Sequence, residues 1–259
     1  MRLPRMALLG LTAAAVMTGV LAGSQPVAAT STAPSGSITV SAAASLTDVF
    51  PVIAAAFQKR FPGTTVNFNF GGSSALVEQV NAGAPVDVLA TASEPTMWKA
   101  ANAGNTGRPL LFAKNTMAIA MPPGNPAGIR SLSDLSRSDV LTAVCAVAVP
   151  CGSAARDLFS RNGVSVKPVT FELDVRGVLG KVMADEVDAG IVYATDVRSA
   201  GSRVASVPIP ADRNVTTTYP IATVTSGPNP VTARAFVAYV RYSRSAQGIL
   251  RAYGFARPW

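Results

Sequence analysis

The chain has 259 residues, of which 49% are hydrophobic and 14% are charged, and its formal net charge is +8. This length and apolar content exclude a disordered protein and suffice for one large domain or for two lobes with separate cores. The lysines and arginines are scattered singly, without a basic run or interleaved aromatic residues. The positive charge therefore predicts solubility and weak attraction of anions, and no nucleic-acid partner.

Residues 1–29 have the three parts of a secretory signal peptide. Two arginines precede an apolar stretch at 7–22, and a small-residue cleavage pattern follows at 27–29. We therefore expect the mature protein to act outside the cytoplasm, in the periplasm or at the cell envelope. Residues 20–24 also resemble a bacterial lipobox, but Ser24 stands where lipid attachment requires a cysteine, which argues against a lipid anchor.

The mature chain begins with a Ser/Thr/Pro-rich stretch and continues with alternating strand and helix patterns. Residues 30–36 predict a flexible tether. No later apolar run reaches the roughly 18 residues needed to cross a bilayer. Period-2 or short apolar runs predict strands near residues 38–40, 66–70, 86–90, 117–121, 140–149, 169–171, 189–193, 204–207 and 219–224. Helical patterns cover residues 45–61, 75–80, 96–103, 132–135, 154–161, 174–185, 231–243 and 246–253. This alternation predicts an α/β fold with mostly parallel sheets.

Four of the strand-to-helix turns consist of small or polar residues, and they lie at Ser45, Ser73, Cys151–Gly152 and Asp174–Val175. Ser45, followed three residues later by Asp48, is typical of a capping box and predicts Ser45 as an N-cap. Ligands of α/β sheets bind at the carboxyl ends of strands, where helices begin, and a helix N-terminus favours an anion. These turns predict one anion site built from several helix starts. The alternative is a set of ordinary capped helices that bind nothing.

The two cysteines, Cys145 and Cys151, lie six residues apart in a chain that is expected to be exported. This context favours a disulfide over a metal pair or a nucleophile. A bridge requires the chain to turn between Ala146 and Pro150, because an extended segment would hold the two Cα atoms too far apart. Two buried free thiols are the alternative.

Five motifs in order resemble the molybdate-binding proteins of bacterial molybdate ABC importers: residues 42–47, 81–87, 149–152, 174–177 and 190–193. The resemblance covers nearly all of the mature chain. It implies a two-lobe type II periplasmic-binding-protein-like fold with two strands crossing between the lobes. It also implies one lobe from residues 37–113 plus 222–259 and another from residues 114–221. A monomer that delivers its ligand to a membrane permease is expected.

The resemblance also implies a set of oxyanion-binding residues: Ser45, Ser73, Cys151, Val175 and Tyr193, with Ser74 and Gly152 as possible neighbours. Hydroxyls of Ser45, Ser73 and Tyr193 would donate hydrogen bonds, and backbone N–H groups of Ser45, Cys151 and Val175 would complete the shell. Tyr193 could instead be a core tyrosine, and Val175 could serve packing alone. For Arg176 we expect an ion pair with Asp87 or Asp174.

The expected function is a receptor that captures molybdate or tungstate as its bound ligand, with no cofactor and no metal-cation ligands. An enzyme is disfavoured because the chain contains no His, no Gly-x-Ser-x-Gly elbow and no Ser-x-x-Lys near these serines. Without His, no group at the site is expected to titrate near neutral pH. The alternatives are a receptor for sulfate or another tetrahedral oxyanion on the same fold, and a surface interaction module without a small ligand.

Overall fold

The computed structural model describes residues 33–258. The expected signal peptide and residues 30–32 of the expected tether lie outside the described residues. Further along that segment, the Ser35 N–H donates to the Thr232 hydroxyl (2.9 Å), which in turn donates to the Ser35 carbonyl (2.7 Å). Gly36 is already the first residue of a strand. The folded chain therefore begins within the stretch that was expected to be a tether.

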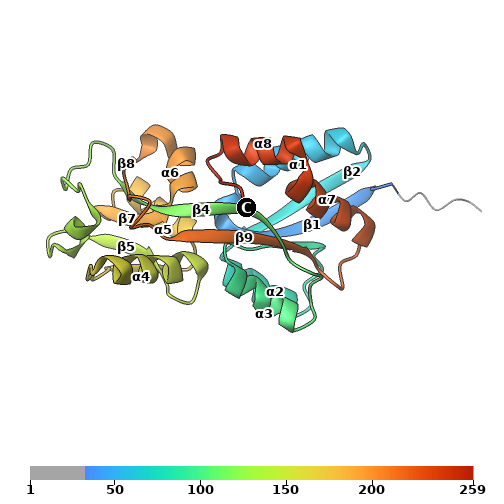
Figure 1. Ribbon diagram of the computed structural model, residues 1–259, viewed down its shortest axis with the longest axis horizontal. Helices are drawn as coiled ribbons and strands as arrows, with labels where there is room; N and C mark the ends of the chain where they lie inside the picture. The colour runs from blue at the N-terminus through green and yellow to red at the C-terminus, as the bar shows by residue number, and fades with distance from the viewer. Residues whose placement is uncertain (1–32, 259) are drawn as a thin grey trace, which may run out of the picture. The chain divides into compact units, whose positions relative to one another are not determined.

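Strands and helices alternate along the chain (Figure 1), as the sequence predicts. The strands are β1 (Gly36–Ala43), β2 (Thr64–Gly71), β3 (Val88–Ala90), β4 (Leu110–Met121), β5 (Thr142–Cys145), β6 (Thr170–Glu172), β7 (Ala189–Tyr193), β8 (Ala205–Pro208) and β9 (Thr216–Thr223). The α-helices are α1 (Val49–Arg60), α2 (Ser73–Asn81), α3 (Glu94–Asn102), α4 (Pro150–Asn162), α5 (Val175–Met183), α6 (Ala194–Ala200), α7 (Pro230–Tyr242) and α8 (Arg244–Ala252). Short 3-10 helices are η1 (Ala44–Leu46), η2 (Leu132–Ser136) and η3 (Gly201–Arg203). Helix α6 is not expected from the sequence, because no turn residue separates it from β7.

The strands pair in the order β2-β1-β3-β9-β4-β7-β5-β6, with β8 also paired to β4. At one end of this order β1 is parallel to β2 and β3, and β9 is antiparallel to β3. At the other end β5 is parallel to β6 and β7. The two groups of parallel strands agree with the predicted, mostly parallel sheets. The predicted helix starts follow the carboxyl ends of these strands.

Strand β4 belongs to both sets of strands. Its residues Leu110–Thr116 pair with β9, whereas Met117–Ala120 pair with β7. We call β1–β3 and β9 with the helices packed on them (α1–α3, α7 and α8) the first lobe, and β5–β8 with α4–α6 the second lobe. This confirms the predicted two-lobe α/β fold. Of the two strands expected to cross between the lobes, β4 runs from one lobe into the other, and β9 pairs with it in the antiparallel direction up to Thr116. The lobe boundaries at residues 113 and 222 stay predictions.

The first predicted helix begins later than its sequence pattern indicates. Ser45 lies in η1, and α1 begins only at Val49, with Asp48 as its N-cap residue and no side-chain cap. The predicted capping box is therefore wrong. Its two polar side chains are engaged elsewhere: the Ser45 hydroxyl contacts Tyr219, and the Asp48 carboxylate pairs with Arg176. The helical pattern predicted further along is confirmed, since Phe50, Ile53 and Phe57 recur at three- and four-residue steps on one face of α1 and are fully buried.

The two cysteines form a disulfide, as predicted, with their Cα atoms 5.7 Å apart. The chain turns between them as a bridge requires: the Val149 N–H donates to the Ala146 carbonyl at 3.0 Å, and α4 starts at Pro150. The bridge therefore ties the end of β5 to the first turn of α4.

Candidate functional site: a small cavity at the helix starts

One cavity, with a volume of about 20 Å³, lies where strand ends of both lobes meet the beginnings of helices. Its walls come from the junctions β1–η1, β2–α2 and β3–α3 of the first lobe, and from the starts of α4 and α5 and the end of β7 in the second. The lining residues are Ala43, Ala44, Ser45, Gly71, Gly72, Ser73, Ala92, Val149, Pro150, Cys151, Asp174, Val175 and Tyr193.

The cavity brings together all five residues that the resemblance singles out, which are Ser45, Ser73, Cys151, Val175 and Tyr193. The two possible neighbours are not among its lining residues. The hydroxyl of Ser74 donates to the Ala148 carbonyl at 2.8 Å. A Cβ atom on Gly152 would lie 1.9 Å from the Ala146 carbonyl oxygen, so this position must be glycine to let the chain turn back towards β5.

The Ser45 hydroxyl is buried and lies 2.9 Å from the hydroxyl of Tyr219 on β9. The Tyr219 hydroxyl also accepts from the side-chain amide of Asn115 at 3.4 Å, and that amide donates to the Thr195 hydroxyl at 2.7 Å. This buried hydrogen-bond network holds the Ser45 side chain in place. A hydroxyl that accepts from Tyr219 keeps its own proton for donation into the cavity.

Ser73 is the first residue of α2, and its hydroxyl oxygen accepts the N–H of Ala92 at 3.1 Å. Its own O–H remains available as a donor at the cavity wall. Its neighbour Gly72 lies against the backbone of the second lobe. A Cβ atom there would lie 2.5 Å from the Leu173 carbonyl oxygen, so only glycine lets the two walls come this near.

Tyr193 ends β7 and is 1% exposed. Its ring centre lies 6.0 Å from that of Tyr219, and its hydroxyl makes no hydrogen bond of normal geometry among the described residues, although the hydroxyls of Tyr219 and Thr217 lie near it. Burial raises the pKa of Tyr193 well above its ordinary value, with further increases from the neighbouring Tyr219 and Asp196. The phenol therefore stays protonated, and it places an unpaired donor at the cavity, where an unpaired polar group is costly.

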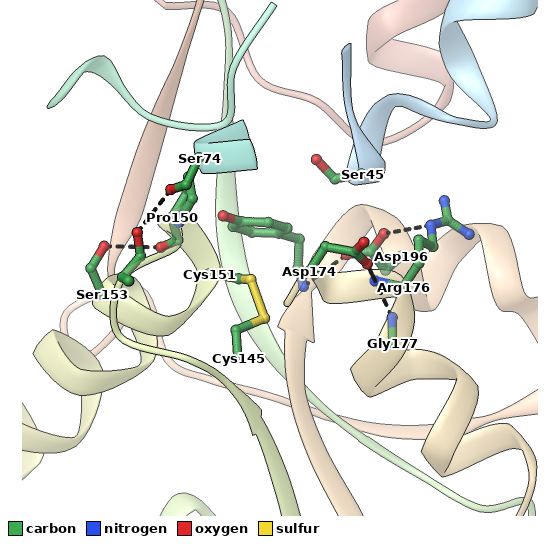
Figure 2. The surroundings of a disulfide bond; sticks show 12 residues. Ser45, Ser74, Cys145, Pro150, Cys151, Ser153, Asp174, Arg176, Gly177 and Asp196 are labelled. Carbon is green, nitrogen blue, oxygen red and sulfur yellow. Dashed lines mark hydrogen bonds and ion pairs between the residues drawn. A yellow bond between two sulfur atoms is a disulfide. The ribbon is translucent and has the colours of Figure 1, made fainter. Parts of the chain in front are cut away.

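Backbone donors at the cavity come from the starts of α4 and α5. In α4 the N–H groups of Gly152 and Ser153 donate to the Val149 carbonyl, and Cys151 is the second helical residue. The first N–H groups of a helix lack partners inside the helix, and they carry the positive end of its dipole. At α5 the Asp174 carboxylate caps the N–H groups of the two residues after Val175, at 2.8 and 3.1 Å. The predicted helix start at Asp174 is thereby confirmed (Figure 2).

Arg176 does not pair with Asp87 or Asp174, so that expectation is wrong. Asp87 accepts the backbone N–H groups of Thr39 and Asn229, and Asp174 is occupied as the helix cap. Arg176 instead contacts Asp48 of the first lobe and Asp196 of the second. The fold brings these two carboxylates to one guanidinium, although the two aspartates are 148 residues apart in the sequence.

The sequence expectation of no titrating group near neutral pH must also be corrected. Asp196 is fully buried on α6, one hydrogen bond away from the cavity residue Tyr193, whose N–H it accepts at 3.1 Å. Burial raises the pKa of Asp196 to about 7, against the opposing effect of the nearby Arg176. Within residues 33–258, no group of three or more His, Cys, Asp or Glu residues could hold a metal ion.

Three residues of this region could not be assigned from the sequence: Tyr219, Asn115 and Asp196. A signal exists only for Tyr219, which, like Tyr193, is a polar-tipped aromatic residue in an apolar strand. The other two acquire their place through contacts between residues far apart in the chain. No local pattern marks them.

Comparison with known proteins gives one consistent picture. Residues 38–256 match the family described as bacterial extracellular solute-binding protein. The chain is 41% identical over 254 residues to the molybdate-binding protein ModA of Mycobacterium tuberculosis, covering 96% of this chain and 97% of that protein. Among solved structures, the periplasmic molybdate-binding protein of Azotobacter vinelandii is similar with a TM-score of 0.75 at 18% identity, over 86% of this chain and all of that one. The sulfate-binding protein SubI of M. tuberculosis is similar with a TM-score of 0.74 at 21% identity, over 86% and 87% of the two chains.

Proposed function

The chain belongs to the bacterial extracellular solute-binding proteins, and we propose that it captures molybdate in the cavity at the helix starts. It hands the ion to the membrane permease of an ABC importer. The observation that carries the proposal is the chemistry of the cavity wall. Apart from the Asp174 carboxylate, which caps α5, its polar groups are hydroxyl and backbone N–H donors. One of them, the Tyr193 hydroxyl, is buried without a hydrogen bond of normal geometry among the described residues.

The donors divide between the two lobes. Ser45 and Ser73 of the first lobe and Tyr193 of the second offer hydroxyl protons, and the starts of η1, α4 and α5 offer N–H groups of Ser45, Cys151 and Val175. A tetrahedral dianion presents four oxygen atoms that accept such bonds in all directions, and these charge-assisted bonds are stronger than neutral ones. Its charge is further stabilised by the helix dipoles.

The small volume supports an inorganic ion over an organic solute. The cavity volume of about 20 Å³ lies far below the roughly 300–1,000 Å³ typical of pockets for drug-sized ligands. Fold alone does not select the ion, since both a molybdate-binding and a sulfate-binding protein share it. Molybdate is preferred because the relative at 41% identity over nearly its whole length is a molybdate-binding protein. We extend the proposal to tungstate, which has the same charge and tetrahedral shape. Sulfate is the alternative ligand.

No bond is made or broken in this role. A serine acts as a nucleophile only beside a base that can take its proton. The chain has no His, and the carboxylate at the cavity, Asp174, already caps two N–H groups of α5. Binding without reaction fits a protein that works outside the cytoplasm as a monomeric carrier. In the part of the chain that the structure describes, no helix is long and apolar enough to span a bilayer.

Thermal unfolding in a panel of oxyanions tests the proposal. At a ligand concentration 100 times Kd, binding adds about 2.7 kcal/mol to stability. For a domain of this size we expect this to raise the melting temperature by roughly 5 to 10 °C. Molybdate and tungstate should give this shift, sulfate a small one and phosphate none. A shift with sulfate alone would establish the alternative receptor, and no shift with any anion would refute an oxyanion site.

A further inference from the structure

Arg176 is the second residue of α5, directly after the cavity residue Val175, but its own side chain does not line the cavity. Its guanidinium lies between two carboxylates. One Nη donates to an oxygen of Asp48, and Nε lies 3.4 Å from an oxygen of Asp196. Figure 2 shows the contact with Asp196 beside the helix start at Asp174.

The two carboxylates differ in where they come from. Asp196 belongs to the same lobe as Arg176, is fully buried, and is fixed by the Tyr193 N–H at 3.1 Å. Asp48 belongs to the first lobe as the N-cap residue of α1, and its side chain is 37% exposed. The pair with Asp196 therefore lies within one lobe, whereas the pair with Asp48 joins the two lobes and exists only when they are in contact.

The charges around this cluster make Arg176 its essential cation. Besides the increase due to burial, Arg176 lowers the pKa of Asp196, whereas the negative charges of Asp48 and Asp174 raise it. Asp48 also faces the Ser199 hydroxyl and the charge of Arg203. Partial burial alone would raise the pKa of Asp48, but the hydrogen bond from Arg176 holds it below its ordinary value. The contact therefore favours the ionised carboxylate, as an ion pair requires.

We propose that Arg176 and Asp48 form an interlobe latch, a pair of positioning residues that holds the lobes closed over the anion without touching it. The latch rests on the proposed function. Strand β4 pairs with strands of both lobes and so connects them. When two connected lobes move as rigid bodies, a contact that forms only in the closed arrangement shifts the population towards the closed form. A second interlobe contact, from the Ser74 hydroxyl to the Ala148 carbonyl, is neutral and hence weaker.

The substitution Asp48→Asn separates a latch from a bystander by the direction of its effect. A negative charge near the cavity repels a dianion, so a bystander's removal would leave molybdate affinity unchanged or raise it. A latch predicts that affinity falls by about 3- to 10-fold, the range of a partly exposed, charge-assisted contact. Ligand-free melting should change little, because Asp48 caps no N–H of α1. Asp157→Asn is the matched control, since it removes a carboxylate from an exposed ion pair within α4.

A double-mutant cycle provides the decisive measurement. Calorimetric titration with molybdate compares the wild type, Asp48→Asn, Arg176→Gln and the double variant. Because each substitution removes the same contact between Asp48 and Arg176, its loss should be counted only once, and the effects of the two substitutions on molybdate affinity should not add. If Arg176→Gln does not fold, because Asp196 loses its counter-charge, the whole cycle is run with Asp196→Asn in every member.

The possible outcomes test the latch separately from the proposed molybdate-binding function on which it rests. If the wild type binds molybdate but the cycle is fully additive, the latch is refuted and the proposed function is retained. The same holds if Asp48→Asn binds molybdate as tightly as the wild type or more tightly. A wild type that does not bind molybdate overturns both. Weaker binding by Asp48→Asn, no change in Asp157→Asn and a non-additive cycle support the latch.

Discussion

The hydroxyl of Tyr193 offers a substitution whose effects on stability and on binding have opposite signs. This hydroxyl is buried, and it makes no hydrogen bond of normal geometry among the described residues, with the Tyr219 and Thr217 hydroxyls nearby. Tyr193→Phe removes a desolvated donor and no well-formed hydrogen bond, so stability measured without ligand should stay the same or rise by up to about 1 kcal/mol. Molybdate affinity should fall by about 10- to 150-fold, because a charge-assisted hydrogen bond contributes about 1.5 to 3 kcal/mol.

Denaturant unfolding without ligand and calorimetric titration with molybdate measure the two quantities separately. Ser45→Ala is the comparison variant. It also removes one proposed donor, but it breaks the contact with Tyr219, so it should lose about 1 kcal/mol of ligand-free stability and a similar factor in affinity. Unchanged affinity in Tyr193→Phe would refute the proposed role of this hydroxyl. A large loss of ligand-free stability would show that it has a partner in the fold.

Three further predictions concern closure, selectivity and pH. Small-angle scattering should give a smaller radius of gyration with molybdate than without, because the donors come from both lobes; identical curves would indicate a cavity that is already closed. Phosphate should bind at least about 100-fold more weakly than molybdate in competition titrations, because near pH 7 it buries an O–H without an acceptor; displacement of molybdate at equal concentration would identify Asp174 as that acceptor. The free energy of unfolding should fall by about 1.4 kcal/mol from pH 6 to pH 8 through Asp196, and this part of the fall should vanish in Asp196→Asn.

The sign of that pH effect follows from the raised pKa. The unfolded carboxyl group, with an ordinary value of 3.8, is ionised throughout this range, whereas in the fold burial keeps the proton bound up to about pH 7. The stabilisation by this proton is complete only below the ordinary value and is lost as the pH rises through 7. An equal slope in Asp196→Asn would assign the pH dependence to another group.

Periodic patterns predicted the fold well, because burial in an α/β protein follows local hydrophobic spacing. The runs at 189–193 and 169–171 became β7 and β6 with nearly the same bounds. The small-residue turns also predicted where cavity-lining residues meet, since parallel strands bring their carboxyl ends to one edge. Whether the five residues bind the anion stays a prediction.

Two of the errors, the capping box and the partner of Arg176, share one physical cause, which is competition between local and distant partners for the same polar group. Ser45 and Asp48 have the spacing of a capping box, yet their side chains bind Tyr219 and Arg176. Arg176 has an acid beside it in sequence, yet it pairs with Asp48 and Asp196. Local spacing states what a side chain can reach within a few residues. It contains no information on what the fold brings from elsewhere.

We expect the disulfide to make molybdate binding depend on the redox state of the compartment in which the protein resides. Cys151 supplies one of the proposed N–H donors, and the bridge to Cys145 holds that first turn of α4 against the end of β5. Thiols stay reduced in the cytoplasm and pair in oxidising compartments. We therefore expect the unexported chain, with both thiols free, to hold this donor less firmly and to be a weaker competitor for the ion. Export and oxidation would then act as a maturation step that keeps the carrier from sequestering its cargo inside the cell that needs it.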